Sequence, residues 1–167
     1  MQARDLSEVL QINGTARPGV APLEAREFSR LLALAHAHLV ATGASGKLSG
    51  YLLAFHGDTP YDGEEFLSFR RTLAEPYIYI DQVAVVPAFE GTGVARALYQ
   101  ELESIARGQG IRLLCCEVNL RPSNARSRAF HEKQGFGSQG RLSTDDGREV
   151  LLMTKRLHDG REPGTAS

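Results

Sequence analysis

The sequence predicts a single α/β domain, with a central mixed sheet and flanking helices. Its length of 167 residues is that of one domain, and it is sufficient to bury a core. Apolar residues alternate in several short segments, as in half-buried strands, and recur at helical spacing in others. A strand, a helix and a second strand follow one another over 77–120, which indicates a parallel pair joined by a right-handed crossover.

The N-terminal half is predicted to fold as two helices followed by a hairpin. The expected elements are helices over 5–12 and 23–35, strands over 36–42 and 48–56, and one or two helical turns within 64–71. Glycines and prolines in NGTARPGVAP separate the two helices, and the turn GASGK joins the two strands. The polar segment from Thr59 to Pro76 is expected at the surface, where it either builds a substrate pocket or only connects two elements.

The C-terminal half carries the most regular pattern. We expect strands over 77–86, 112–120, 136–142 and 149–156, and helices over 93–107 and 124–134. Apolar residues share one face of the first of these helices, and Gly108 and Gly110 end it. The domain is therefore expected to span residues 1–157. The polar sequence HDGREPGTAS, residues 158–167, is expected to form a flexible C-terminal tail.

Composition and charge exclude several classes of protein. The net charge of −1, from 19 Lys and Arg against 20 Asp and Glu, gives no basic field for binding nucleic acid non-specifically. The N-terminus has acidic residues and no apolar signal core, and no apolar stretch is long enough to span a membrane. We therefore expect a cytoplasmic protein that binds neither nucleic acid nor membranes.

Neither the cysteines nor the histidines form a metal motif. Cys115 and Cys116 are adjacent, unlike the cysteines of a CxxC motif, and are expected to be reduced strand residues. His36 and His38 alternate on a strand without the carboxylates or cysteines that would complete a metal site. No bound metal is therefore expected.

The stretch VAVVPAFEGTGVARALYQEL turns tightly from a strand into a helix at Gly91 and Gly93. The first amides of a helix lack intrahelical acceptors and carry partial positive charge, so this turn can bind an anion, although glycine also serves turns without a ligand. A dinucleotide-binding motif would need a third glycine where Arg96 stands. The other glycine-rich stretch, GASGKLSG, lacks the first glycine of a phosphate loop and is expected to be a hairpin turn.

Together with CEVNLRPSNARSRAFHEKQGF, this stretch resembles the paired signature of the GNAT N-acetyltransferase superfamily. The signature consists of a strand, a Gln/Arg-x-x-Gly-x-Gly/Ala turn into a helix, and a second helix that starts with Asn and ends in Lys-x-Gly-Phe. The match extends from Tyr77 to Phe136. The resemblance implies a GNAT-like sheet that is mixed, mostly antiparallel and splayed between strands 77–86 and 112–120, where acetyl-CoA binds.

The resemblance also implies which residues bind acetyl-CoA. The main chain of Val83, Ala84 and Val85 would pair with the pantetheine arm as another strand does, and the amide near Val85 would donate to the developing oxyanion. Asn124 matches the asparagine that contacts the cofactor arm. The turn amides would hold the pyrophosphate, and they belong to Gly91, Thr92, Gly93, Val94, Ala95 and Arg96.

Two residues depart from the family pattern. Glu90 stands where relatives usually have Gln or Arg, and a carboxylate beside a pyrophosphate is unfavourable unless it points away. His131 stands where many relatives have the tyrosine thought to protonate the departing thiolate. An imidazolium, with a pKa of about 6.5, can protonate a thiolate whose conjugate acid has a pKa of about 8.5. His131 lies two helical turns after Asn124, so both are expected to face the same ligand; the alternative is a surface histidine without a chemical role.

Two carboxylates are candidates for the base that takes the proton of an acceptor amine. If strand 77–86 alternates regularly, Asp81 shares a face with Val83 and Val85, unless a bulge resets the register. Glu117 shares a face with Asn119 on the next strand. Each acid is either such a base, acting directly or through water, or a hydrogen-bonded carboxylate that shapes the sheet.

The surface excursion contributes a further set of candidates. Tyr61, Asp62, Glu64 and Glu65 either line an acceptor pocket, which would favour a cationic amine, or form a solvated charged face.

The sequence as a whole predicts an acetyl-CoA-dependent N-acetyltransferase that transfers the acetyl group directly to a primary amine. A small-molecule or amino-acid-like acceptor is the first choice, and a protein N-terminus or lysine is the second. The two departures leave a non-catalytic acyl-CoA-binding or sensor domain as an alternative, and a different phosphorylated ligand as another. Family members are often dimers, so a homodimer is an expectation by analogy only.

Overall fold

The computed structural model describes residues 1–16 and 24–158. The α-helices are α1 (Leu6–Thr15), α2 (Ala25–Leu34), α3 (Glu64–Thr72), α4 (Val94–Gly108) and α5 (Ala125–Lys133). The strands are β1 (Ala37–Thr42), β2 (Leu48–His56), β3 (Tyr77–Val85), β4 (Leu113–Arg121), β5 (Gly137–Ser143) and β6 (Glu149–Arg156). Short 3₁₀ segments span Ala3–Asp5 and Pro87–Phe89.

Every helix and strand that the sequence predicts is present, with ends displaced by a few residues. Part of the predicted break after the first helix, and the predicted tail from residue 159 onward, lie outside the described residues. Over 1–16 and 24–158, no helix combines the length and the apolar character needed to cross a membrane.

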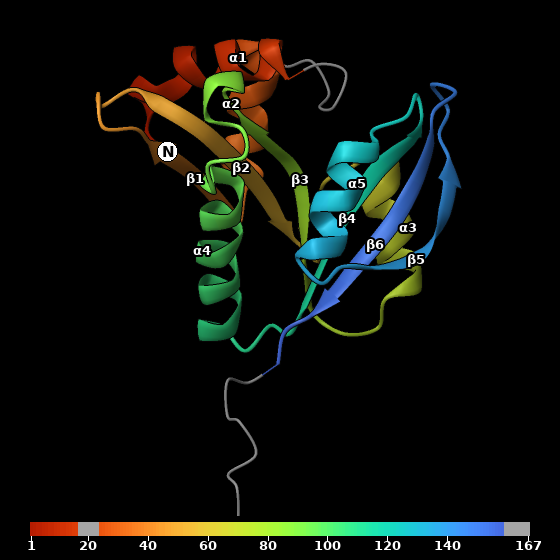
Figure 1. Ribbon diagram of the computed structural model, residues 1–167. Coiled ribbons are helices and arrows are strands. Elements are labelled where there is room, and N and C mark those ends of the chain that lie inside the picture. Colours follow the sequence, from red (N-terminus) through yellow and green to blue (C-terminus); the bar gives the residue numbers. More distant parts are fainter. Residues whose placement is uncertain (17–23, 159–167) are drawn as a thin grey trace, which may run out of the picture.

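The strands form one open sheet in the order β1-β2-β3-β4-β6-β5 (Figure 1). Only the β3–β4 pair is parallel, and the other neighbours are antiparallel. The predicted fold class, a mixed and mostly antiparallel sheet with flanking helices, is therefore confirmed.

Helices cover both faces of this sheet. α4 and α5 lie on one face, and α1, α2 and α3 lie on the other (Figure 1). The core beneath α4 joins Leu98 and Leu102 to Ile78 of β3, and the core beneath α3 joins Phe66 to Tyr79 of β3. Burying each such side chain contributes about 1.5–3 kcal/mol. β3 is thus held from both faces and forms a fixed wall at the centre of the molecule.

β3 and β4 separate after a short region of pairing. Their paired residues are Tyr77 with Leu113, Ile78 with Leu114 and Tyr79 with Cys115. β2 pairs with the other edge of β3 as far as Val85. In the part of the chain that the structure describes, no strand pairs with the inner edge of β3 beyond Tyr79. A row of backbone N–H and C=O groups therefore faces the opening, and the predicted splay is present.

A β-bulge at Asp81 corrects the predicted register of β3. The residues on either side of Asp81 pair with adjacent residues of β2, so Asp81 is an extra residue in the ladder. Val83 consequently packs into the core beneath α4, whereas Ala84 lies in the core beneath α1. The expectation that Asp81 shares a face with Val83 and Val85 is wrong, because strict alternation does not continue through an inserted residue.

The start of α4 lies close to the sheet because β2 has a glycine there. A Cβ at Gly50 would lie 2.8 Å from the carbonyl oxygen of Ala84 and 3.0 Å from Cγ1 of Val94, the first residue of α4. Both distances are too short for unstrained packing. Gly50 therefore allows the glycine turn before α4 to approach β3.

We expect Gly50→Ala to destabilise the fold by about 1–3 kcal/mol, because the methyl group must displace backbone or the start of α4. Urea unfolding followed by circular dichroism measures the change. Gly140→Ala in β5 is the matched control, since a Cβ there meets no atom within 4 Å. Equal stability of the two variants would show that α4 does not depend on this close approach.

Candidate active site

A pocket of about 540 Å³ opens where β3 and β4 separate, between the start of α4 and α5. Small-molecule sites usually occupy about 300–1,000 Å³. The predicted site residues on its wall are Asp81, Val83, Ala84, Val85, Gly91, Gly93, Val94, Ala95, Arg96, Glu117, Asn124 and His131. The wall leaves out Thr92, whose hydroxyl donates a hydrogen bond to the carbonyl oxygen of Phe89 at 2.6 Å.

The turn before α4 has a backbone conformation that depends on glycine. Gly91 has a φ of 77°, and Gly93, the N-cap of α4, has a φ of 96°. A Cβ at either residue would meet no atom within 4 Å, so open space adjoins the backbone. The first amides of α4 and the positive end of its dipole lie at this turn. The arrangement fits a phosphate group bound by the main chain.

The start of α5 borders the same pocket. Asn124 is its N-cap, and the side-chain oxygen of Asn124 accepts a hydrogen bond from the backbone N–H of Ser127 at 3.2 Å. This cap uses the oxygen of the side chain and fixes its direction. The NH₂ group of Asn124 can therefore donate to an acceptor in the pocket.

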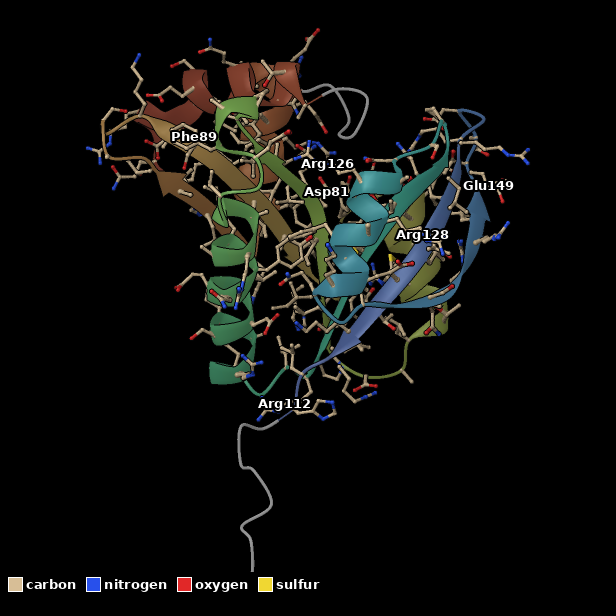
Figure 2. All side chains as sticks on the ribbon, in the orientation of Figure 1. Asp81, Phe89, Arg112, Arg126, Arg128 and Glu149 are labelled. Atoms are coloured by element: carbon tan, nitrogen blue, oxygen red, sulfur yellow. The ribbon has the colours of Figure 1, made fainter. Side chains whose placement is uncertain are left out.

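Asp81 is a half-buried carboxylate held by a tyrosine. The hydroxyl of Tyr61 donates a hydrogen bond to Oδ1 of Asp81 at 2.8 Å. Burial raises the pKa of Asp81 to about 7 against the opposing effect of this hydrogen bond, and the charge of Glu65 raises it further. Asp81 lies beside the opening between β3 and α5 (Figure 2). The pocket therefore contains a group that changes charge near neutral pH.

Glu117 lies on β4, the strand on the other side of the splay. Burial raises the pKa of Glu117 well above its usual value, and the charges of Glu65 and Asp81 add to the rise, whereas a hydrogen bond from Tyr79 lowers it. Its Oε2 is buried and has no hydrogen-bond partner within residues 1–16 and 24–158. A buried oxygen without a partner costs free energy, so this site favours a ligand or water that donates a hydrogen bond.

The excursion before α3 supports these acids from outside the pocket wall. The ring of Tyr61 packs against those of Phe55, Phe66 and Tyr79. The three predicted acids have other partners: Asp62 lies 3.4 Å from Arg30, Glu64 accepts from the N–H of Asp145 at 3.1 Å, and Glu65 accepts from Arg148 at 2.9 Å. Tyr61 is thus the residue of this segment that reaches the pocket, through its hydrogen bond to Asp81.

His131 is buried, with 3% of its surface exposed, among the rings of Tyr99, Phe130 and Phe136. Its Nδ1 lies 2.8 Å from the carbonyl oxygen of Ser127, which only accepts, so Nδ1 carries the proton of the neutral ring. Nε2 then accepts a hydrogen bond from the hydroxyl of Tyr99 at 2.7 Å. Burial lowers the pKa of His131 against the effect of the Ser127 carbonyl, so the ring is neutral at pH 7.

The adjacent cysteines are free thiols on opposite faces of β4. Burial raises the pKa of both, and the charge of Glu117 raises it further, so Cys115 and Cys116 stay protonated. Cys116 lines the pocket, but a protonated thiol is a weak nucleophile. In the ranges that the structure describes, no cluster of three or more His, Cys, Asp or Glu side chains is arranged to hold a metal.

Tyr99 and Arg126 line the pocket although the sequence pattern did not identify them. Tyr99 follows Leu98 on the apolar face of α4, and a buried tyrosine requires a partner for its hydroxyl. That requirement is the signal that points to Tyr99. Arg126 has no comparable signal, because Arg128 on the same helix looks equivalent in the sequence.

We expect Asp81→Asn to stabilise the fold increasingly as the pH rises. The pKa of Asp81 is about 7 in the folded state and 3.8 as an ordinary carboxyl, so the unfolded state loses its proton first and wild-type stability falls between these values. Asn has no proton to lose. Its advantage over the wild type should grow by at most about 4 kcal/mol between pH 4 and 8, measured by urea unfolding.

Asp146→Asn is a control of opposite sign for this experiment. Hydrogen bonds from Thr144 and Arg148 lower the pKa of Asp146 to about 2. This variant should lose stability at neutral pH and approach the wild type as the pH falls through about 2. A difference between Asp81→Asn and the wild type that does not vary with pH would mean that the fold leaves the pKa of Asp81 unchanged.

Known proteins resemble this chain in sequence and in fold. The acetyltransferase (GNAT) family model matches residues 6–136. N-alpha-acetyltransferase RimI of Mycobacterium tuberculosis is 30% identical over 115 residues, which make up 68% of this chain and 60% of that protein. The chain thus aligns with less than two thirds of the length of this curated relative.

Two solved structures share the fold at lower identity. The ribosomal-protein-S18-alanine N-acetyltransferase from Escherichia coli superposes with a TM-score of 0.71 at 20% identity, covering 98% of this chain and 94% of that one. A NatB acetyltransferase complex bound to CoA and MES superposes with a TM-score of 0.72 at 22% identity, covering 95% of this chain and 97% of that one. With the family model matched over most of its length, the chain belongs to the acetyltransferase (GNAT) family.

Proposed function

We propose that this protein transfers the acetyl group of acetyl-CoA to a primary amine. The observation that carries the proposal is the free edge of β3 beside the glycine turn, both on the wall of one pocket. An extended amide-containing ligand can pair with such an edge as an added strand. The turn adjoining it suits the phosphates at the other end of the same ligand. Membership of the acetyltransferase family and the NatB structure with CoA support acetyl-CoA as this ligand.

Three parts of the chain would hold acetyl-CoA, which supplies the acetyl group as an activated thioester. The main chain of Val83–Val85 would pair with the pantetheine arm. The amides from Gly91 to Arg96 would bind the pyrophosphate, with Thr92 contributing main chain only, since its side chain points to Phe89. The NH₂ group of Asn124 would donate to the arm from the opposite side.

Asp81 is the proposed base for the proton that the amine loses. It lies on the pocket wall, and its pKa of about 7 makes it ionised but still basic near neutral pH. Burial raises the pKa of Glu117 well above its usual value, and Glu117 would complete the polar end of the pocket rather than act as the base. Cys116, the thiol on the pocket wall, stays protonated and is a weak nucleophile, so the acetyl group would pass directly to the amine.

The neutral His131 has no proton directed at the sulfur, so the assistance that the sequence suggested for His131 would come from Tyr99, whose hydroxyl His131 positions. At rest the single N–H of the neutral imidazole is directed to the carbonyl of Ser127, and Nε2 holds the hydroxyl of Tyr99. The Tyr99 hydroxyl can turn from Nε2 to donate a hydrogen bond to the sulfur. The high pKa that burial gives to Tyr99 means that its proton stabilises the thiolate without being transferred.

The acceptor that we expect first is a small molecule or an amino acid with a primary amine, since acids at the pocket attract a cationic ligand. A protein N-terminus is the second candidate, because the curated relative is named as an N-alpha-acetyltransferase. Both offer the same reacting group. Rates of acetyl transfer to free amino acids and small amines, compared with the rates for peptides that have a free N-terminus, decide between the two. Peptides that contain a lysine but have a blocked N-terminus test the lysine alternative.

We expect Gly93→Trp to weaken acetyl-CoA binding by about 100-fold or more, because the indole covers amides that make charge-assisted hydrogen bonds. Isothermal titration calorimetry measures the affinity. Gly147→Trp is the matched control: it also has a positive φ, of 83°, with open space around it, but it lies off the pocket wall. A wild type that does not bind acetyl-CoA would refute the proposal. Binding without transfer to any amine would instead indicate a sensor domain.

We expect the pH profile to identify the base. Asp81 accepts a proton only when it is ionised, so kcat/KM should rise as the pH increases through about 7. Asp81→Asn should lower kcat/KM by about 100-fold or more and remove this rise, whereas Glu117→Gln should retain it. The acceptor amine also titrates, but its ionisation is the same for every variant assayed with the same acceptor. Differences between the variants therefore report the enzyme. If Glu117→Gln removed the rise and Asp81→Asn retained it, Glu117 would be the base.

A further inference from the structure

An ion pair joins the two sides of the pocket beside the glycine turn. Nη1 of Arg126, in the first turn of α5, donates to Oε2 of Glu90, which directly precedes the glycine turn. Both side chains line the pocket. Glu90 is the residue at which the sequence departs from the Gln or Arg of its relatives. In this chain, the cation near that position comes from another helix.

The guanidinium of Arg126 is only partly used by this pair. It has five N–H donors in a planar fork, and one nitrogen contacts Glu90. Within residues 1–16 and 24–158, no other hydrogen bond or ion pair of Arg126 is formed. Its side chain is 69% exposed, so the remaining donors are accessible from the pocket. Arginine with free donors beside a main-chain anion site is suited to binding phosphate oxygens in a bidentate manner.

We propose that Arg126 is a phosphate-binding residue of the acetyl-CoA site and that Glu90 holds it across the glycine turn. This inference rests on the proposed function, since it assigns a residue to the same ligand. The Glu90 carboxylate would otherwise repel the pyrophosphate, and the pairing neutralises it while orienting the guanidinium. Arg126 thus replaces, from α5, the positive charge that the turn itself lacks at Glu90.

Arg128 provides a matched control on the same helix. It lies two residues further along α5, is off the pocket wall, and pairs with Glu132 at 2.8 Å. Figure 2 shows Arg126 at the side of α5 that faces the opening and Arg128 away from it. Substitution of either arginine changes the net charge equally, so a difference between the variants reports position.

The test is calorimetric binding of acetyl-CoA and of S-acetyl-pantetheine, which lacks every phosphate. Arg126→Gln should weaken acetyl-CoA binding by about tenfold or more and lower its dependence on salt, because one charged contact to phosphate is lost. Arg128→Gln should change the affinity by less than about twofold. Neither variant should alter binding of S-acetyl-pantetheine. Equal effects of the two substitutions, or an equal loss for both ligands, would overturn the assignment.

The double variant Glu90→Gln/Arg126→Gln separates direct contact from neutralisation of Glu90. Direct contact predicts that Arg126→Gln still weakens binding in the Glu90→Gln background. If Arg126 only shields the carboxylate, the double variant will bind acetyl-CoA as Glu90→Gln does, and the proposal fails. Binding of 3′-dephospho-acetyl-CoA shows which phosphate Arg126 contacts. If Arg126→Gln weakens binding of this ligand as much as binding of acetyl-CoA, the contact is to the pyrophosphate. If Arg126→Gln no longer weakens binding, the contact is to the 3′-phosphate.

Failure of this inference and failure of the proposed function give different results. Acetyl-CoA binding by the wild type that is insensitive to Arg126→Gln refutes the inference alone. A wild type that binds no acetyl-CoA refutes both.

Discussion

The early separation of β3 from β4 is the constraint on which the rest of the site depends. Only the pairs from Tyr77–Leu113 to Tyr79–Cys115 join these strands, although the two are neighbours in the sheet. The backbone groups that β4 leaves unpaired must bond to water or to an extended ligand, because buried N–H and C=O groups are costly when left alone. The same separation makes room between α4 and α5. It therefore gathers the glycine turn, the cap of α5 and both carboxyls around one pocket.

The two carboxyl groups at this opening, Asp81 and Glu117, lower the stability of the fold. Asp81 occupies a bulge, which removes it from the regular ladder, and burial disfavours its charged form. Glu117 leaves one oxygen without a partner in the described part of the chain. Aromatic packing holds this arrangement in place, since the ring of Tyr61 contacts Phe55 and Phe66 while its hydroxyl donates to Asp81. The apolar core and the polar site are thus joined through one side chain.

Periodic features of the sequence were sufficient for the elements, and the resemblance to the GNAT family predicted the sheet class and about half of the residues on the pocket wall. Alternation and helical spacing report burial, and the glycines at Gly91 and Gly93 report a backbone that other residues rarely adopt. The face of Val83 was predicted wrongly because a bulge depends on the ladder with β2 and not on local preference. Arg126 could not be distinguished from Arg128, since its role depends on Glu90, which lies far away in the chain but close in the fold. The negative charge of Glu90, which looks unfavourable in the sequence, is thus paired with an arginine on another helix.

The unpaired edge of β3 also bears on how the protein behaves when it is empty. An exposed strand edge is a template for pairing with other chains, and proteins usually block such edges with charge, short strands or covering elements. Here α4 and α5 flank the edge, and the pair between Glu90 and Arg126 spans its outer end. These elements leave access for a slender ligand but hinder a second polypeptide strand. The helices that line the opening therefore also limit how closely another strand can approach this edge.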